Sequence, residues 1–490
     1  MNTDKSKPSI AVQHHGHVVV IQATERSICV YLRSSAVALA LALAGCAVGP
    51  DYKKPEVVAP QAYKEAGTWV VAKPSDTVPK GKWWEAFRDP ILSGLVEQVE
   101  VSNQSLAAAM ARYRQAQAAT ASARSGYFPV LGYDVNGQRQ GQGTGVITGS
   151  GLGNRYTAEL NAKWEVDLWG NIRRQVEAAS ATEQASAADL NNARLSLQAQ
   201  LVTNYYLLRV ADVNTDLLED TVKAFENSLR MTQNRYAGGV AAKVDVVQAQ
   251  AQLASTRASL VDLRATRATL EHSIAVLIGK PPSEFTLEPA KFDLHIPDIP
   301  PGLPSTLLER RPDIAEAERN MAAANARIGV ATAAYFPSLS LSGYYGGASS
   351  ASHQLLQAPF RIWAVGADLA GAIIDFGARS SQVDLARAQY DEQVATYRQT
   401  VLAGFQEVED NLANVHWLTE ETKVEQEAAR AARESVTLTV NQYKAGTVSY
   451  LNVVTVQATQ LSEEAKLVTL LGRRLSATVV LMRALGGTWE

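Results

Sequence analysis

What this sequence lacks excludes several classes of protein. Its 46 Lys and Arg residues are balanced by 49 Asp and Glu residues, so there is no electrostatic case for nucleic-acid binding. The chain has 490 residues, yet no apolar run reaches the roughly eighteen residues of a membrane-spanning helix. Any contact with a membrane must therefore come from strands, from an amphipathic surface or from a lipid.

Cysteines and catalytic motifs are also scarce. Cys29 and Cys46 are the only cysteines, which excludes a disulfide scaffold. The patterns GxSxG, HExxH and GxxxxGKS do not occur, and the Gly-rich stretch 141–154 lacks the Lys-Ser/Thr pair of a phosphate loop. The histidines beyond residue 46 have no ligand-spaced partner: His272, His295, His353 and His416. We therefore expect no enzyme activity, no metal site and no cofactor.

The first residues have the features of a secretory leader. Basic residues precede the apolar stretch AVALALALA (36–44), which runs into LAGC (43–46). Small residues directly before a cysteine, after such a stretch, resemble the lipobox of a bacterial lipoprotein signal peptide. The resemblance implies that residues 1–45 are removed, Cys29 among them, and that Cys46 carries a covalent N-acyl and S-diacylglycerol lipid. The alternative is a short buried apolar segment with a chance cysteine.

An internal repeat organises the rest of the chain. Three motifs return after an offset of 207 or 208 residues: YFP (127–129) at 335–337, LWG (168–170) as DFG (375–377), and RYAGGVAAKVDVVQAQAQL (235–253) as QYKAGTVSYLNVVTVQATQ (442–460). Each half is predicted to hold a helix, a β-hairpin, a long helix, a turn and a further helix.

The repeat predicts the following division of the chain. A Pro-rich, lipidated N-terminal arm is expected over 46–88, and a helix after Asp89-Pro90 is expected to run to Pro129. The predicted segments are the first repeat 89–278, with a β-hairpin at 127–169 and a long helix at 171–236, a linker at 279–304, and the second repeat 305–487, with a β-hairpin at 335–374 and a long helix at 378–443.

The predicted long helices are several times longer than an average helix. Residues 171–236 contain no Pro or Gly and would extend about 99 Å as one helix. Small and apolar residues follow a 3-4 spacing that allows close helix approach: Ala178, Ala181, Ala185, Ala188, Asn192, Leu195, Ala199, Val202 and Tyr206. This pattern indicates a coiled coil or a helical tube. The alternative is two ordinary bundle hairpins, each with a break that the sequence hides.

The stretch RYTAELNAKWEVDLWG (155–170) is the clearest strand signal. Its residues alternate, so one face carries Tyr156, Leu160 and Trp164 while the other carries Glu, Lys and Asp. The two repeats would supply four strands, too few for a barrel, and an open sheet leaves backbone groups unsatisfied in lipid. A membrane interpretation therefore requires several chains; three would give twelve strands, apolar outside and polar inside. The alternative is a soluble coiled coil with a small sandwich.

Several motifs together resemble the outer membrane factor family, the TolC- and OprM-like channels of tripartite efflux pumps, and within it the NodT-type lipoproteins. LAGCAVGPDYKKPEV (43–57) is similar to the start of the lipoprotein branch. LLERRPDIAEAERNMAAANARIGVATAAYFPSLSLSG (307–343) is the most distinctive block, and the turns RYxxG…DV and YKxG…LNVV also match. The resemblance covers about residues 46–487.

The resemblance implies both a fold and a role. The fold would be mainly α with membrane β: a homotrimer whose twelve-stranded β-barrel is continuous with a long periplasmic α-helical barrel. Chain ends and the linker 279–304 would form an equatorial belt. In the outer membrane of a Gram-negative bacterium, it would passively export drugs, toxic compounds or metals, together with a periplasmic adaptor and an inner-membrane pump of RND or other type. Alternatives are a type I protein secretion channel and a structural periplasm-spanning lipoprotein.

The resemblance also implies a periplasmic gate at the two helix turns, Tyr236–Asp245 and Tyr443–Thr455. Tyr236, Gly238, Gly239 and Gly446 would shape these turns. Asp245 matches a gate-bridging carboxylate, Tyr443 matches a gate tyrosine, and Leu451 matches an apolar constriction ring. Asp245 could equally be a carboxylate stabilised by the helix dipole, and both roles can hold.

This chain departs from the family pattern at three gate positions. Asn452 and Thr455 stand where some members have Asp, and Val448 stands where TolC-like members have an Arg. We therefore expect a closure of mixed leucine and polar side chains rather than a strongly anionic, salt-bridged one.

Overall fold

The computed structural model describes residues 47–54, 64, 81–141, 152–290, 297 and 310–487. Cys46 and the predicted leader lie outside these residues. The chain divides into two compact units. The sheet unit comprises the chain up to Tyr52, Thr120–Ala179 and Ala323–Tyr390, and the helical unit comprises Lys53–Ala119, Ser180–Ala322 and Asp391–Glu490.

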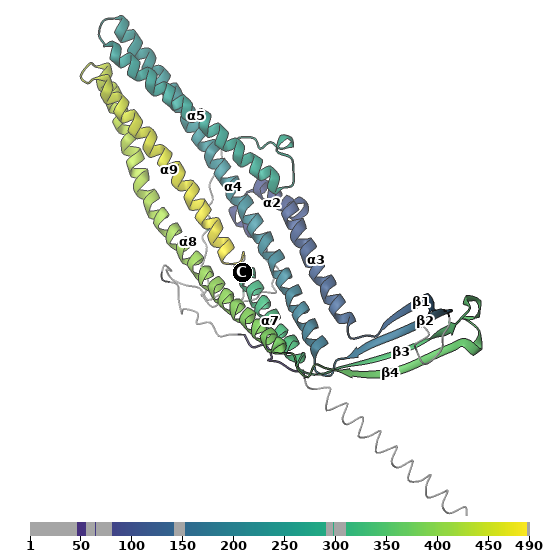
Figure 1. The fold of residues 1–490 in the computed structure, drawn as a ribbon. Coiled ribbons are helices and arrows are strands. Elements are labelled where there is room, and N and C mark those ends of the chain that lie inside the picture. Colours follow the sequence, from purple (N-terminus) through teal and green to yellow (C-terminus); the bar gives the residue numbers. More distant parts are fainter. Residues whose placement is uncertain are drawn as a thin grey trace, which may run out of the picture. The chain divides into compact units, whose positions relative to one another are not determined.

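One antiparallel sheet of four strands forms the centre of the sheet unit (Figure 1). Its strands, in spatial order, are β1 (Val130–Gly141), β2 (Leu152–Val166), β3 (Ser338–Ser349) and β4 (Arg361–Ala370). The two hairpins join through β2 and β3, where Leu160 pairs with Tyr345 on one side and with Tyr133 on the other. Directly paired residues point to the same face of a sheet. The register therefore places the apolar residues of all four strands on one face and the polar residues on the other.

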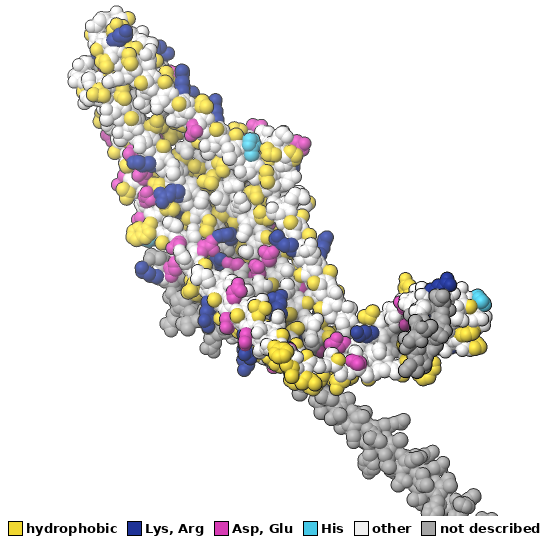
Figure 2. All heavy atoms as spheres, viewed as in Figure 1, with side chains coloured by type: hydrophobic (Ala, Val, Ile, Leu, Met, Phe, Trp, Pro, Cys, Tyr) yellow, Lys and Arg dark blue, Asp and Glu magenta, His cyan; other side chains and the backbone are white. Residues whose placement is uncertain are grey.

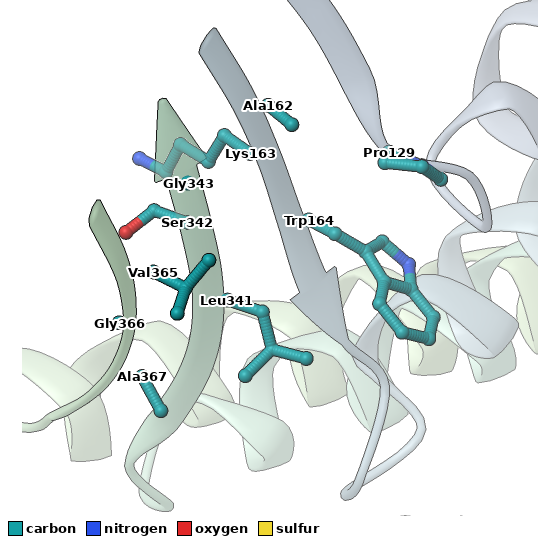
Figure 3. Close-up of a pocket in the computed structure, with 10 residues that line it drawn as sticks. All are labelled: Pro129, Ala162, Lys163, Trp164, Leu341, Ser342, Gly343, Val365, Gly366 and Ala367. Atoms are coloured by element: carbon teal, nitrogen blue, oxygen red, sulfur yellow. The ribbon is translucent and has the colours of Figure 1, made fainter. Parts of the chain in front are cut away.

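The aligned register gives the sheet one apolar and one polar face. The apolar face carries Leu131, Tyr133, Val135, Ala158, Leu160, Ala162, Trp164, Leu341, Tyr345, Trp363, Val365 and Leu369. The polar face carries Asp134, Asn136, Thr157, Glu159, Asn161, Lys163, Glu165, Ser340, Ser342 and Asp368. In Figure 3, Lys163 and Ser342 extend to the opposite side of their strands from Trp164. The apolar face is open, because Tyr133 is 81% exposed and Val365 is 79% exposed.

Two of the predicted strands end earlier than the alternation suggested. β2 stops at Val166 because the next carboxylate, Asp167, accepts the backbone N–H groups of Ile172 and Arg173 at 2.9 Å and so begins the following helix. The second hairpin was expected to continue to residue 374, but its last pair joins Ser338 to Ala370. Pro337 stands next and has no N–H to continue the ladder.

The helices are α2 (Pro90–Ser102), α3 (Gln104–Ser125), α4 (Asn171–Ala237), α5 (Lys243–Leu277), α7 (Pro312–Ala333), α8 (Ala378–Lys444) and α9 (Tyr450–Ala484). Short 3-10 helices are η1 (Trp83–Phe87), η2 (Pro282–Glu284), η3 (Ser352–Gln354) and η4 (Ala358–Phe360). α4 and α8 each have 67 residues, and α5 and α9 each have 35. The two long helices are therefore unbroken. Among the described residues, no helix has the length and apolar character to cross a bilayer.

The helix expected from residue 90 to Pro129 is in fact two helices. Asn103 interrupts it with an extended backbone (φ −67°, ψ 121°). Its side-chain amide donates to the Leu277 carbonyl at 2.7 Å, and its side-chain oxygen accepts the Leu106 N–H at 2.9 Å. The break ends α2 and caps α3, and it ties both to the end of α5.

The end of the predicted N-terminal arm is not extended. Residues 83–87 form η1, and Trp83, Trp84 and Phe87 are buried in the largest core of the helical unit. That core also contains residues of α2, α4, α5 and α9 and Leu287 of the linker. Residues near both chain ends and in the middle thus share one core. Most of the linker beyond residue 290 lies outside the described residues.

Candidate functional site at the helix turns

The turns that join α4 to α5 and α8 to α9 have the same backbone geometry. Gly239 (φ 73°) and Gly446 (φ 80°) occupy the left-handed region, which glycine adopts without a steric penalty. In the first turn, the Val240 N–H donates to the Arg235 carbonyl at 2.9 Å, and in the second the Thr447 N–H donates to the Gln442 carbonyl at 3.0 Å. These bonds spanning five residues are those of a Schellman motif, which ends a helix at glycine.

An aromatic core lies directly beside the second turn. The rings of Tyr443 and Tyr450 have centroids 5.5 Å apart at an interplanar angle of 58°. Both side chains are buried, and Ala249 and Val453 complete the cluster. Burial raises the pKa of Tyr450 to about 12, and the nearby Tyr443 and Asp245 also act to raise it. The predicted gate tyrosine is therefore an interior residue of this chain.

A cation joins the end of α4 to the end of α8. The Arg235 guanidinium lies over the Tyr443 ring, 4.7 Å from its centroid. It also donates to the carbonyls of Tyr443 at 3.2 Å and Lys444 at 3.5 Å. These carbonyls belong to the last turn of α8, where the helix dipole attracts positive charge. Arg235 therefore ties the first helical hairpin to the second.

The other predicted gate residues lie at the surface. Leu451 is 55% exposed and Tyr236 is 47% exposed. Asn452 and Thr455 are also exposed, and the Thr455 hydroxyl donates to the Leu451 carbonyl at 2.9 Å. The side chains of Leu451, Asn452 and Thr455 therefore stand on the open side of α9, away from the aromatic core. Figure 2 shows hydrophobic side chains on this end of the helical unit.

Asp245 lies in the first turn of α5 and is partly buried. Its backbone N–H donates to the Ala242 carbonyl at 3.1 Å, and the N-cap residue Ala242 offers no side-chain acceptor. A carboxylate in this position stabilises the helix N-terminus electrostatically. The equivalent position of α9 is Asn452, whose N–H donates in the same way to Ser449 at 3.2 Å.

Sequence reasoning missed Arg235 and Tyr450 as members of this site. Val448 led us to expect a gate without an arginine. Its side chain is partly buried beside the tyrosine cluster. The arginine comes instead from α4, and its counterpart 207 residues later is Gln442. The signal was thus a difference between the repeats: one turn begins RYAGG and the other QYKAG.

Ion pairs connect the two helices within each hairpin. Arg257 of α5 contacts Glu226 of α4 at 2.6 Å, and Arg433 of α8 contacts Glu464 of α9. The pair of Arg257 and Glu226 is exposed, and such a pair contributes about 0–1 kcal/mol, whereas Glu464 of the other pair is buried. The two ion pairs keep each hairpin together without joining it to the other. Within the described parts of the chain, no three His, Cys, Asp or Glu residues group as a metal site.

The sequence and the fold agree with those of known proteins. The family model described as outer membrane efflux protein matches residues 95–280 and 303–487. The chain belongs to this family. The family resemblance found in the sequence is therefore confirmed, as is a place in the outer membrane of a Gram-negative bacterium.

Individual relatives match over nearly their full length. The pyoverdine export outer membrane protein OpmQ of Pseudomonas aeruginosa is 31% identical over 93% of this chain and 97% of its own. The toluene efflux pump outer membrane protein TtgC of Pseudomonas putida is 30% identical over 92% of this chain and 94% of its own. The solved outer-membrane channel OprN superposes with a TM-score of 0.84, at 34% identity, over 91% of this chain and 100% of its own. The mostly helical fold is that of outer membrane efflux channels, and the role is that of an efflux channel.

Proposed function

We propose that this chain forms, as a homotrimer, the outer membrane channel of a tripartite efflux pump. The observation that carries the proposal is the sheet, whose four strands share one apolar and one polar face. β1 and β4 are its edges in the described chain, and in lipid the backbone groups of such edges need partners. A neighbouring copy that pairs β4 with β1 would supply them.

Three copies would pair every edge strand and would also give a barrel of sufficient size. Each copy brings four strands, and bacterial outer membrane barrels have about eight strands or more. Three copies would close a barrel of twelve, with Trp363 and Leu160 toward lipid and Glu159 and Lys163 toward a wet lumen. The two pairs of equally long helices, α4 with α8 and α5 with α9, favour a continuation into a helical barrel of quasi-sixfold packing.

The helix turns would form the periplasmic gate. In a trimer around one axis, exposed Leu451, Asn452 and Thr455 of three copies could meet as a constriction of mixed apolar and polar character. Asp245 would contribute a carboxylate near the same end. Opening would require the hairpin ends to separate, which breaks the contact between Arg235 and the last turn of α8.

The partners follow from the lack of an energy-converting motif in the sequence. An inner-membrane pump, of RND or another type, would deliver the substrate, and a periplasmic adaptor would bind the turns and favour the open state. The relatives named above export pyoverdine and toluene. We therefore propose small molecules as cargo, including drugs, toxic compounds or metals. A covalent lipid on Cys46, which lies outside the described residues, would add an anchor.

The decisive experiment is planar-bilayer conductance of the purified protein, wild type against the double variant Leu451→Ser with Asp245→Ala. We expect a wild type that is mostly closed and a variant that conducts. Large, constant conductance in both would keep the channel and refute the gate residues. No conductance from either folded oligomer would refute the channel and favour a structural lipoprotein.

Oligomer size needs its own measurement. Cysteines placed on the two edge strands, at Val135 of β1 and at Val365 of β4, should form crosslinks between copies and give a trimer as the largest species. The chain has only Cys29 and Cys46 as native cysteines, so background crosslinking is small. A dimer as the largest crosslinked product would contradict the twelve-stranded barrel.

A further inference from the structure

The residues directly after Cys46 are held in the sheet unit by several specific hydrogen bonds and close backbone contacts. The segment Ala47–Tyr52 lies against the beginning of α4 and the second half of α7. The Val48 N–H donates to the Trp169 carbonyl at 3.0 Å. The Asn325 side-chain amide of α7 donates to the Pro50 carbonyl at 2.9 Å. An extended arm that only linked Cys46 to the helices would not require these two hydrogen bonds.

A buried arginine makes most of the contacts. Arg174 of α4 is only 4% exposed. Its Nε donates to the Val48 carbonyl at 3.2 Å, and its Nη2 donates to the Gly49 carbonyl at 3.3 Å and to Asp51 at 2.8 Å. Its Nη1 donates to Glu177 at 2.8 Å. Three of these four hydrogen bonds go to residues 48–51, and a buried guanidinium that lost them would be left with unsatisfied donors, at a cost in free energy.

The backbone of the segment fits closely against α7. Gly49 has a φ of 96°, in the region that favours glycine. A Cβ atom at Gly49 would lie 2.4 Å from the Cα atom of Gly329, and one at Gly329 would lie 2.7 Å from Cγ of Arg174. Two glycines and the arginine stem therefore occupy one tight stack, which a side chain at either glycine would disrupt.

We propose that Arg174, Asn325, Gly329 and the Trp169 carbonyl form a seat for residues 47–52, and that this seat fixes the lipid-bearing residue where the helices meet the sheet. The inference rests on the proposed lipidation of Cys46. A long arm alone would let the acyl chains enter the bilayer anywhere within its reach. With the seat occupied, the acyl chains start beside the sheet of their own chain.

The surroundings of Ala47 identify where the lipid would start. The Cα of Ala47 lies 2.8 Å from where a Cβ on Gly170 would stand. The neighbouring Trp169 ring stacks on Phe336 with centroids 4.7 Å apart, and its Nε1 donates to the carbonyl of Pro337, directly before β3, at 2.8 Å. Any group on residue 46 begins one peptide unit, about 3.8 Å, from Ala47. The acyl chains would therefore begin next to an aromatic pair at the base of the sheet.

The test uses the thiol of Cys46 itself as the reporter. Export behind a leader without a lipobox leaves Cys46 free, and it is then the only thiol of the mature chain, since Cys29 lies in the leader. A bimane label on it is quenched when tryptophan is in contact. We expect strong quenching in the folded oligomer, and its loss in Trp169→Phe, which identifies Trp169 as the quencher.

Two variants empty the seat from opposite sides. Arg174→Met removes the donors and keeps the stem, and Gly49→Ala introduces the clash with Gly329. Both should raise bimane emission to the level of the Trp169→Phe protein while the oligomer remains folded. The matched control is Arg230→Met, because Arg230 is an exposed arginine of the same helix that donates only within its own turn, to Asn227.

The outcomes separate the seat from the proposed lipidation. Unquenched emission in the wild type, or quenching that survives both seat variants, overturns the seat. Mass spectrometry of the protein with its natural leader tests the lipid independently. A missing acyl mass on a quenched, seated N-terminus would overturn the anchoring role, while the channel proposal would still depend on conductance alone.

Discussion

Replacing Arg235 should open the channel, because its guanidinium supplies charged hydrogen bonds between the first helical hairpin and the end of α8 at the turns. Arg235→Met removes two charged hydrogen bonds, at 3.2 and 3.5 Å, and a cation–π contact at 4.7 Å. Both bonds are long, and the side chain is only partly buried, so we take values at the low end for such contacts. Together they would stabilise the closed state of the proposed gate by about 2 kcal/mol.

A loss of about 2 kcal/mol shifts the closed-to-open equilibrium about 30-fold, since about 1.4 kcal/mol corresponds to a factor of ten. Single-channel recording in planar bilayers measures this as a rise in open probability with unchanged conductance. Arg235→Lys should give a smaller rise, because a lysine keeps the charge but not the fork of donors.

Arg230→Met is the control for a general effect of removing a charge near the end of α4. Its guanidinium donates to Asn227 of the same helix and not to the second hairpin. Equal opening in both methionine variants, or an Arg235→Met channel as closed as the wild type, would refute the proposal that Arg235 holds the two hairpins together. A changed conductance would indicate a different pore rather than a changed gate.

Further predictions concern the sheet, the helix break and the tyrosine cluster. Val365→Lys on the apolar face should cost about 2–4 kcal/mol in the bilayer, whereas Ala364→Lys on the polar face should cost far less. Heat-dependent gel mobility of the proposed trimer compares the two variants, and equal losses of stability would contradict the assignment of faces. Asn103→Ala should lower stability by about 1–3 kcal/mol in thermal melts, and Gln104→Ala should not. The pKa of Tyr450 is raised to about 12, so its contribution to stability is complete below pH about 10 and is lost as the pH rises toward about 12. The melting temperature of Tyr450→Phe should therefore fall less steeply than that of the wild type as the pH rises through this range. The same dependence of melting temperature on pH in both proteins would contradict burial of the hydroxyl.

The two faces of the sheet could be predicted because they need only local information. Alternation of apolar and polar residues in β2 assigns its faces, and the same period in the other strands aligns with it once the strands pair. The strand ends depended on single residues with a second role. Asp167 leaves the ladder to cap α4, and Pro337 cannot donate to it.

The first long helix could also be predicted, because the 66 residues from 171 to 236 contain no Pro or Gly and therefore no stop signal. The break at Asn103 could not be predicted in this way. Asparagine within a helical stretch resembles any exposed polar residue, and the partner that makes it a break is the Leu277 carbonyl, 174 residues away. For the same reason, nothing in the Pro-rich composition of the arm indicated that Trp83 and Trp84 would be buried.

The contact of Arg235 with the end of α8 shows that the two turns differ although they come from a repeat. Both turns have the same glycine geometry, and Tyr236 corresponds to Tyr443, yet one ring is 47% exposed and the other 3%. The acceptors of Arg235 are main-chain carbonyls, which every residue type provides. Only the donor therefore depends on the side chain, and Gln442, its counterpart, cannot place a charge over a tyrosine ring. A single substitution in one repeat is enough to make two similar hairpins unequal, and in the proposed gate the strength of that inequality would set how readily they separate.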